Sequence, residues 1–269
     1  MIKVSKKNEV YLKVESDPST AQEINDFFTF DVPGAKFMPS YRNRMWDGKA
    51  RLFNMYRQEL YVGLLSYLKE FADTLEYPVE LNMENVGDPI STQYVEKFTT
   101  KLNLQSQGKS IEIYDYQVEA IRHTINEGRS LLLSPTASGK SLIIYCLMQY
   151  HQHLNRKQLI IVPTTSLVEQ MYGDFQDYST ANDWVVQDNC HRIYGGKEKL
   201  NDFPITISTW QSIYKFPKSW FENFDVVYGD EAHLFKAKSL TTILDKCVNT
   251  PYRIGTTGTL DGTQTHKLV

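Results

Sequence analysis

The chain has 269 residues, of which 41% are hydrophobic and 23% charged, and its formal net charge is -3. This composition is typical of a globular protein with room for about two domains, and it excludes a strongly basic protein that would attract polyanions through its overall charge. No apolar run approaches the ~18 residues of a membrane span, and the N-terminus has no signal-peptide core. We therefore expect a cytoplasmic protein with no membrane partner.

The N-terminal residues have the pattern of short strands and helices. Alternating segments at 2–4 and 10–14 predict a hairpin, and residues 18–28 predict a helix with apolar side chains on one side. In the next segment, Asp47-Gly48 is a two-residue hairpin signal, with alternating side chains on both sides of it in residues 44–53. We therefore expect a hairpin that turns at these two residues.

Two further helices are expected before the pattern changes. Residues 60–75 and 94–102 carry helical periodicity, and the polar stretch QSQGKS follows at 105–110. We take this stretch as a linker. Residues 1–104 are then a small α+β accessory domain, and residues 111–269 form a second domain.

Basic residues are concentrated in one part of the first region. Residues 36–57 carry a local charge of +5, interleaved with aromatic side chains, whereas residues 58–96 carry -7. Attraction to a polyanion is therefore confined to the first stretch. Trp46 and Phe53 are expected in the domain core, and the cations are either a solvated face or contacts to DNA phosphates. The residues expected at DNA are Arg42, Arg44, Lys49 and Arg51.

The second region alternates apolar runs with helical patterns. Strands that are apolar on both faces and separated by helices are typical of a parallel α/β sheet that is covered on both sides. The expected strands are SLLLS (130–134), QLIIV (158–162), HRIYG (191–195), ITIST (205–209), DVVYG (225–229) and RIGTT (253–257).

The segment SPTASGKS, residues 134–141, has the ending of a phosphate-binding loop, but Ser134 stands where the first glycine of that pattern would be. Lys140 supplies an ammonium group for the β and γ phosphates, and Ser141 supplies a hydroxyl for Mg²⁺. The loop follows an apolar strand and opens a helix, as phosphate binding requires. A plain strand-to-helix turn is the alternative. The predicted nucleotide-binding residues of the loop are Pro135, Thr136, Ala137, Ser138, Gly139, Lys140 and Ser141.

The segment VVYGDEAH, residues 226–233, is an apolar strand that ends in two acids. Asp230 is expected to hold the Mg²⁺ ion, and Glu231 is expected to polarise the attacking water. His233 takes part in the chemistry, couples the lobes of the motor or only packs. The alternative is a pair of exposed acids that cap a strand. With Lys140, these three residues are the predicted catalytic set.

Three further segments complete a resemblance to superfamily 2 helicases. IVPTTSLVEQMYGDF (161–175), ITISTWQSI (205–213) and IGTTGTL (254–260) resemble motifs Ia, Ib and III, with SPTASGKS as motif I and DEAH as motif II. Ala137 and Thr257-Gly258-Thr259 depart from the family pattern. The resemblance implies a RecA-like ATP-binding lobe that uses ATP and Mg²⁺. It also implies that IYDYQVEAI (113–121) reads adenine, with Gln117 at the base edge and Tyr114 or Tyr116 stacking on it. DNA contacts are implied for Thr164, Thr165, Thr209 and Gln211.

The N-terminal region is also similar to a family member. The segment RMWDGKARLF resembles the accessory domain of a phage recombination helicase of this superfamily. This implies an ATP-dependent helicase or translocase on duplex or branched DNA, with recombination or replication proteins as partners. Such motors have a second lobe, and we expect the 269 residues to be a fragment of one. A restriction-type motor subunit and a non-catalytic DNA-binding module with a nucleotide site are the alternatives.

Overall fold

The computed structural model describes residues 1–83, 86–135, 137–195, 202–236 and 238–258. The chain divides into two compact units, Met1–Glu84 and Asn85–Leu268. Each unit has hydrophobic core clusters of its own. Within the described ranges, no helix combines the length and the apolar character that a bilayer span requires.

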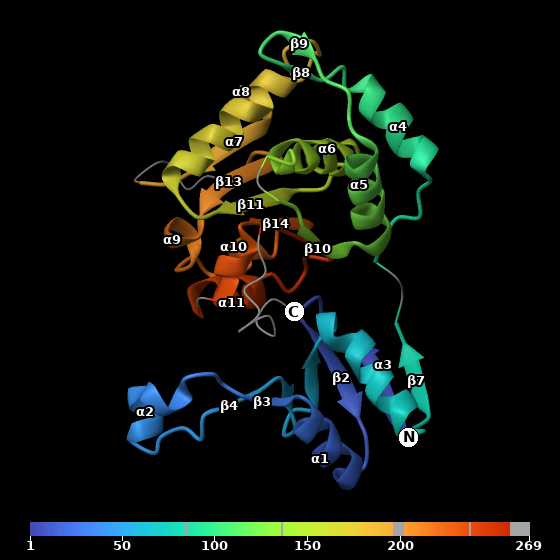
Figure 1. The fold of residues 1–269 in the computed structure, drawn as a ribbon, viewed down its shortest axis with the longest axis vertical. Helices are drawn as coiled ribbons and strands as arrows, with labels where there is room; N and C mark the ends of the chain where they lie inside the picture. The colour runs from blue at the N-terminus through green and yellow to red at the C-terminus, as the bar shows by residue number, and fades with distance from the viewer. Residues whose placement is uncertain (84–85, 136, 196–201, 237, 259–269) are drawn as a thin grey trace. The chain divides into compact units, whose positions relative to one another are not determined.

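The first unit is built on a five-stranded sheet with the order β5, β6, β2, β1, β7 (Figure 1). The predicted hairpin is confirmed as the antiparallel pair β1 and β2, and β7 runs parallel to β1. The sheet and helices α1 and α3 share one core, which contains Val4, Leu12, Ile24 and Leu68. The elements are β1 (Ile2–Lys6), β2 (Tyr11–Glu15), α1 (Pro18–Phe27), β5 (Phe53–Asn54), β6 (Glu59–Tyr61), η2 (Val62–Leu64), α3 (Leu65–Thr74) and β7 (Val79–Asn82).

The helix predicted over 60–75 begins later than expected. Residues Glu59–Tyr61 form β6, which pairs with β2 on one side and with β5 on the other. Leu60 is fully buried in this position. Pairing with two strands outweighs the local helical periodicity, and α3 therefore starts at Leu65.

A segment that we call the arm, residues 29–51, extends from this sheet (Figure 1). Its base is the antiparallel pair of β3 (Thr29–Asp31) and β4 (Lys49–Arg51). Between them lie the short helical turns η1 (Ala35–Phe37) and α2 (Pro39–Arg42). The hairpin predicted at Asp47-Gly48 is therefore wrong, because β4 pairs with a strand that lies far back in the chain.

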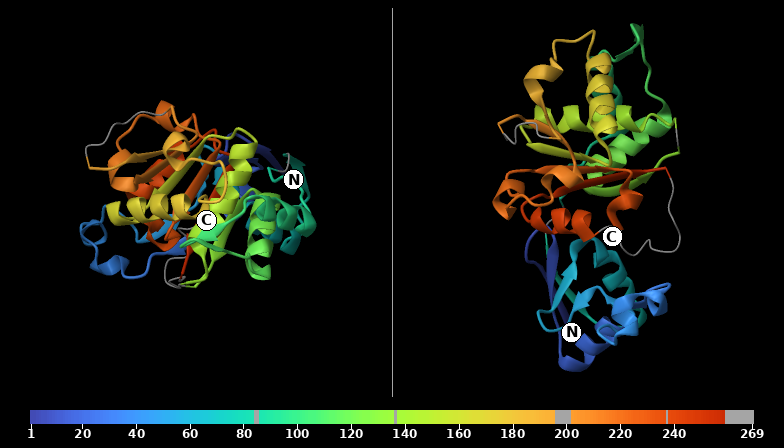
Figure 2. Two further views of the ribbon diagram at one scale, coloured as in Figure 1. Left: turned by 90° about the horizontal axis from the view of Figure 1, so that it is seen from above. Right: turned by 90° about the vertical axis from the view of Figure 1, so that its left-hand side faces the viewer.

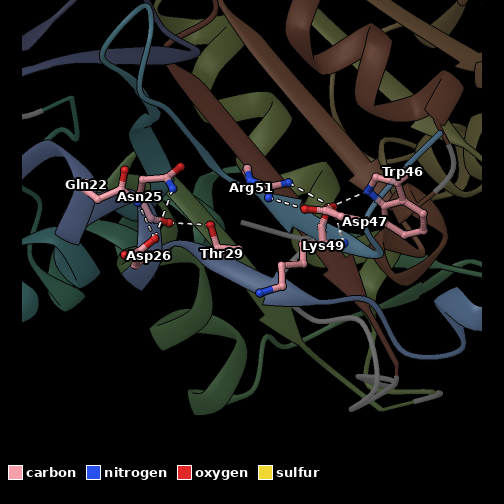
Figure 3. Close-up of polar contacts among 8 residues, drawn as sticks. All are labelled: Gln22, Asn25, Asp26, Thr29, Trp46, Asp47, Lys49 and Arg51. Atoms are coloured by element: carbon pink, nitrogen blue, oxygen red, sulfur yellow. Dashed lines mark hydrogen bonds and ion pairs between the residues drawn. The ribbon is translucent and has the colours of Figure 1, made fainter. Parts of the chain in front are cut away.

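Asp47 and Gly48 form a turn that leads into β4 rather than the tip of a two-residue hairpin. Gly48 has a φ of 80°, and its carbonyl accepts a hydrogen bond from the amide of Val32 at 2.8 Å. The Asp47 carboxylate accepts from the Lys49 amide at 3.1 Å and pairs with Arg51 (Figure 3). The left-handed glycine thus turns the chain into β4.

The second unit contains the predicted parallel sheet. Its six strands run in the order β10, β15, β14, β11, β13, β12, and every neighbouring pair is parallel. The strands are β10 (Arg129–Leu133), β11 (Gln158–Val162), β12 (Cys190–Ile193), β13 (Ile205–Thr209), β14 (Val226–Asp230) and β15 (Tyr252–Thr257). All six predicted strands and the α/β fold class are confirmed.

Helices cover both faces of this sheet (Figure 2). Ile160 and Val162 of β11 belong to the core cluster that includes α5, α6 and α7, whereas Leu159 and Ile161 belong to the cluster with α9, α10 and α11. Alternate residues of the strand therefore pack against the helix layers on opposite faces of the sheet, which explains why the strands are apolar throughout. The helices are α5 (Asp115–Glu127), α6 (Lys140–His153), α7 (Thr165–Tyr178), α8 (Val186–Asn189), α9 (Trp210–Ile213), α10 (Lys218–Phe221) and α11 (Lys238–Lys246), with η3 (Ala232–Lys236).

The boundary between the units lies before the predicted linker. Helix α4 (Thr92–Lys101) contributes Val95 to the core that it shares with α5. Residues 105–110 form a hairpin of β8 (Gln105–Ser106) and β9 (Lys109–Ser110), in which the Gln107 amide donates to the Asp177 carboxylate of α7 at 2.9 Å. The polar composition of 105–110 reflects an exposed turn rather than a linker. Residues 86–110 therefore belong to the second unit.

Asp88 ties the start of the second unit to its sheet. Its carboxylate accepts two hydrogen bonds from Arg156, at 2.6 and 3.2 Å, and further bonds from Tyr150 and Tyr252. The Arg156 guanidinium also lies 4.0 Å from the centre of the Tyr252 ring. Burial raises the pKa of Asp88, but the hydrogen bonds and the charge of Arg156 outweigh this effect and leave the pKa below its ordinary value.

We expect Asp88→Asn to lower the free energy of unfolding at pH 7 by about 1–3 kcal/mol, because Arg156 loses its charged acceptor. The depressed pKa makes this stabilisation present above the unfolded-state value of about 4, and it is lost as the pH falls through the folded-state value. The difference in stability between wild type and variant should therefore be constant above about pH 4 and should shrink below it. Denaturant unfolding at pH 7, 5 and 3 measures this. Asp183→Asn, an exposed carboxylate, is the control, and an equal loss in both variants contradicts the prediction.

Candidate functional site

The predicted phosphate loop joins the end of β10 to the start of α6. Gly139 is the N-cap of α6 with a φ of 77°, a left-handed conformation that glycine adopts without strain. The unpaired amides at the start of a helix favour an anion at that position. Lys140 Nζ lies 3.3 Å from the carbonyl oxygen of Ser134, so the ammonium group folds back over the loop. Thr136 lies outside the described residues.

Ala137 also adopts a left-handed conformation, with a φ of 65°. In the family pattern a glycine stands at this position, and a Cβ atom there carries a backbone cost of about 1–2 kcal/mol. The Ser138 amide donates to the Pro135 carbonyl at 3.2 Å, and the Ser134 and Ser138 hydroxyls hydrogen bond to each other. These bonds within the loop hold the turn despite the strain.

Gln117 lies against the loop from the first turn of α5. It is 3% exposed, its Oε1 accepts from the Tyr114 amide at 3.0 Å, and its Nε2 donates to the Ser138 carbonyl at 3.0 Å. The Tyr116 hydroxyl donates to the same carbonyl at 3.0 Å. The Tyr114 and Tyr116 rings stack 5.7 Å apart, with 65% and 52% of the residues exposed. The structure thus joins the predicted base-reading segment to the phosphate loop.

Asp230 and Glu231 lie at the carboxyl end of β14. Asp230 is 8% exposed and accepts a hydrogen bond from Thr256 Oγ1 of β15 at 2.8 Å. Burial raises the pKa of Asp230, and the Thr256 bond acts in the opposite direction. Glu231 has a φ of 51°, an unusual conformation for a residue with a side chain, and its Oε1 lies 3.8 Å from Lys140 Nζ. The two acidic residues of the DEAH segment are therefore next to the phosphate loop.

His233 connects the DEAH segment to β15. Its Nδ1 lies 3.2 Å from Glu231 Oε2 and 2.9 Å from Thr257 Oγ1. Thr257 in turn contacts the loop, because its carbonyl accepts from the Ser134 amide at 2.8 Å. A continuous set of contacts thus runs from the loop through β15 and His233 to Glu231. Thr259 and Leu260, the end of the predicted motif III, lie outside the described residues.

The Ser141 hydroxyl points to helix α7. It lies 2.9 Å from the Tyr178 hydroxyl, and either oxygen can be the donor. Burial raises the pKa of Asp174, and the Ser141 hydroxyl opposes that rise. In the described part of the chain, no hydrogen bond joins Ser141 to Asp230. No signal in the sequence marks Asp174 and Tyr178 as neighbours of Ser141, since their i,i+4 spacing shows only that they share a helix face.

Ser141 and Asp230 fit a magnesium site in their chemistry. Mg²⁺ takes oxygen ligands, and proteins often hold it through one or two side chains together with phosphate oxygens and water. Asp230 is a buried carboxylate that pairs with no basic side chain among the described residues. A divalent cation would offset the cost of burying this charge.

Four threonine and glutamine residues of the second unit were predicted to contact DNA. Thr164 is the exposed N-cap of α7 and Thr165 is its first residue, both just after β11. The Gln211 side chain, after the neighbouring strand β13, donates to the Pro163 carbonyl at 3.2 Å. Thr209 is only 4% exposed and hydrogen bonds to Ser212. The structure brings these segments together, with Thr209 inside and the other three side chains at the surface.

The arm in the first unit carries the predicted cationic residues. Arg42, Arg44, Lys49 and Arg51 are all exposed, and Arg51 pairs with Asp47. Among the described residues, the other three form no ion pair. An open hollow of about 600 Å³ is lined by Lys36, Tyr41, Arg42, Arg44, Met45, Trp46 and Asp47. The hollow thus combines cations with two aromatic rings and a methionine side chain.

The two aromatic residues predicted for the domain core have different environments. Phe53 is 2% exposed and belongs to the core of the first unit, as expected. Trp46 is half-buried on the arm, where its Nε1 donates to the Lys49 carbonyl at 2.8 Å (Figure 3). The prediction for Trp46 is wrong, because the arm carries this side chain away from the core.

Comparisons with known proteins agree with this architecture. Residues 110–262 match the family model described as type III restriction enzyme, res subunit, and residues 1–82 match the model of the N-terminal part of the DNA helicase UvsW. The ATP-dependent DNA helicase UvsW of Enterobacteria phage T4 is 34% identical over 256 residues, which cover 93% of this chain and 50% of the relative. The chain therefore spans about half the length of that relative.

Solved structures and a more distant relative extend the comparison. A crystal structure of T4 UvsW superposes with a TM-score of 0.89 and 34% identity, covering 99% of this chain and 95% of that one. A DNA 3'-5' translocase, XPB2 of Sulfurisphaera tokodaii, is 27% identical over 149 residues, 55% of this chain and 31% of its own. The chain thus belongs to the superfamily 2 helicases, with an N-terminal unit of the UvsW type.

Proposed function

We propose that this chain is the nucleotide-binding part of an ATP-dependent helicase or translocase that acts on duplex or branched DNA. One observation carries the proposal. Lys140, at the start of α6, lies within 3.8 Å of Glu231, which follows the buried Asp230 at the end of β14. An ammonium group, a strained acidic residue and a buried carboxylate therefore converge at the N-terminus of a helix, as phosphoryl transfer requires.

In this proposal Lys140 binds the β and γ phosphates, and the amides of the loop 135–139 surround them. Ser141 and Asp230 hold Mg²⁺, which neutralises charge on the phosphate oxygens when it is bound. Glu231 orients and polarises the attacking water, and His233 keeps the Glu231 carboxylate in place. The stacked ring of Tyr114 and the amide of Gln117 position adenine.

DNA contacts are proposed in both units. Thr164, Thr165 and Gln211 are exposed polar side chains at the carboxyl ends of two adjacent strands, where ligands bind in open parallel sheets. Arg42, Arg44 and Lys49 of the arm supply cations for phosphates. We propose duplex or branched DNA as the substrate, and recombination or replication proteins as partners. Both proposals rest on analogy with the phage relative.

Glu231→Gln tests the enzymatic part of the proposal. The change removes the base that polarises water but keeps the shape of the side chain, so ATP hydrolysis should fall by about 100-fold or more. Mg-ATP binding should stay within about threefold, since Lys140 and the loop remain. Hydrolysis with and without DNA is measured by phosphate release, and binding is measured by calorimetry. Unchanged hydrolysis in the variant contradicts the role of Glu231.

A restriction-type motor subunit is the second candidate, because the res-subunit model matches residues 110–262. The N-terminal match favours the helicase, since residues 1–82 fit the N-terminal model of UvsW. A cleavage assay separates the two. ATP-dependent cutting of duplex DNA supports the restriction enzyme, and strand separation or branch migration without cutting supports the helicase.

A further inference from the structure

We infer that Tyr178 and Asp174 are positioning residues for Ser141: they orient its hydroxyl so that one oxygen lone pair stays available to Mg²⁺. The inference rests on the proposed function, because it assigns Ser141 to the metal. It adds two residues that neither the phosphate loop nor the DEAH segment contains. Both residues lie on α7; Asp174 falls inside the segment 161–175 that resembles motif Ia, and Tyr178 follows that segment.

The geometry around Ser141 is specific. Tyr178 and Asp174 are four residues apart on α7 and therefore share one face of the helix. The Tyr178 hydroxyl lies 2.9 Å from Ser141 Oγ, and the Ser141 hydroxyl opposes the rise that burial causes in the pKa of Asp174. All three side chains are partly buried. Water competes weakly for these bonds, so they fix the rotation of the hydroxyl.

The hydrogen-bonding capacity of a serine determines what these two contacts do. A hydroxyl has one hydrogen and two lone pairs, whereas a carboxylate only accepts. In this inference Ser141 donates its hydrogen toward Asp174, and Tyr178 donates to one of the lone pairs of Ser141. The second lone pair is left for a cation. Without Tyr178 and Asp174 the hydroxyl rotates freely. Fixing it then costs conformational entropy when Mg²⁺ binds, and this cost lowers the affinity for the metal.

Tyr178 also has a packing role, which the test must separate from the hydrogen bond. Its ring meets that of Tyr145 edge to face, with the centroids 5.5 Å apart. Tyr178→Phe keeps this ring contact and removes only the hydroxyl. Tyr172→Phe is a matched control, because Tyr172 belongs to the same helix and packs under Arg192 at 3.8 Å.

The experiment measures ADP binding by calorimetry in Mg²⁺ and in EDTA, since ADP avoids turnover. In Mg²⁺, Tyr178→Phe and Asp174→Ala should each weaken binding by about three- to tenfold, the usual effect of one hydrogen bond. In EDTA, both should bind ADP within about twofold of wild type, because the phosphate loop is intact. Ser141→Ala should lose the effect of Mg²⁺, and adding Tyr178→Phe to it should change nothing further. Tyr172→Phe should match wild type in both conditions.

The outcomes distinguish this inference from the proposed function. If wild type binds ADP no better in Mg²⁺ than in EDTA, the metal role of Ser141 fails and the inference fails with it. If Ser141→Ala loses the Mg²⁺ effect but Tyr178→Phe and Asp174→Ala retain it, only the positioning role is overturned. Equal weakening in Mg²⁺ and EDTA also overturns it, because that result indicates packing. Thermal unfolding of each variant verifies that the fold is kept.

Discussion

Lys140→Ala should weaken the binding of Mg-ADP and of Mg-ATP by at least about 100-fold. Lys140 is the basic residue that lies at the loop, with its Nζ 3.3 Å from the Ser134 carbonyl and 3.8 Å from Glu231. Charge-assisted hydrogen bonds to two phosphate oxygens contribute about 1.5–3 kcal/mol each, and both are lost in the variant. The variant also leaves Glu231 facing the phosphates without its cation, which adds repulsion. Calorimetric titration of the 269-residue chain measures the effect.

Lys218→Ala is the matched control for this change. Lys218 is an exposed lysine of the same unit at the start of α10, and it pairs with Glu222, the C-cap of that helix. Its removal should leave nucleotide affinity unchanged, because exposed ion pairs contribute little. Equal affinity in wild type and Lys140→Ala would rule out the phosphate loop as the nucleotide site.

The double change Arg42→Ala, Arg44→Ala should weaken the binding of duplex DNA by about ten- to a hundredfold at low salt. Each phosphate contact that is lost should reduce the slope of log K against log salt by ~0.9, so the pair should reduce it by about 1.8. Both arginines are exposed, line the hollow of the arm and form no ion pair among the described residues. Their charges are therefore available to phosphates. Fluorescence anisotropy over a series of salt concentrations measures both quantities.

A second double variant controls for total charge. Lys3 and Lys69 are exposed basic residues of the same unit outside the arm, on β1 and α3. Lys3→Ala, Lys69→Ala removes the same charge and should leave the slope within about 0.3 of wild type if the contacts are local. If both double variants flatten the slope equally, the arm is not the contact surface. If Arg42→Ala, Arg44→Ala lowers only the thermal stability, the arginines serve the fold.

The parts of the candidate site that could be predicted from the sequence are those whose residues lie in one short, continuous segment. The phosphate loop, its helix and the DEAH strand were recognised because each combines a hydrophobic run with its polar residues in one short stretch. The six strands were found for a similar reason. A strand that is buried on both faces is apolar throughout, so its signal does not depend on what lies beside it.

Errors arose where a segment takes its structure from a distant partner. The Asp47-Gly48 turn has a strong local signal for a hairpin, yet β4 pairs with β3, which begins twenty residues earlier in the chain. Residues 60 and 61 fit the helical periodicity of 60–75, but they belong to β6, which lies between β2 and β5. The stretch 105–110 has the composition of a linker, but Asp177 of α7 holds it in place. In each case tertiary pairing outweighs local propensity.

The sequence by itself therefore determined the class of the protein, the parallel sheet and the residues that carry charge and hydroxyl groups to the phosphate loop. These depend on local hydrophobic pattern and on motifs whose chemistry is contained within a few residues. The tertiary structure alone decided which groups contact them: Thr256 hydrogen bonds to Asp230, Thr257 to His233, and Tyr178 to Ser141. These contacts join strands and helices that are 24 to 37 residues apart in the chain. A local sequence pattern does not predict these contacts, because they depend on the order of the strands in the sheet.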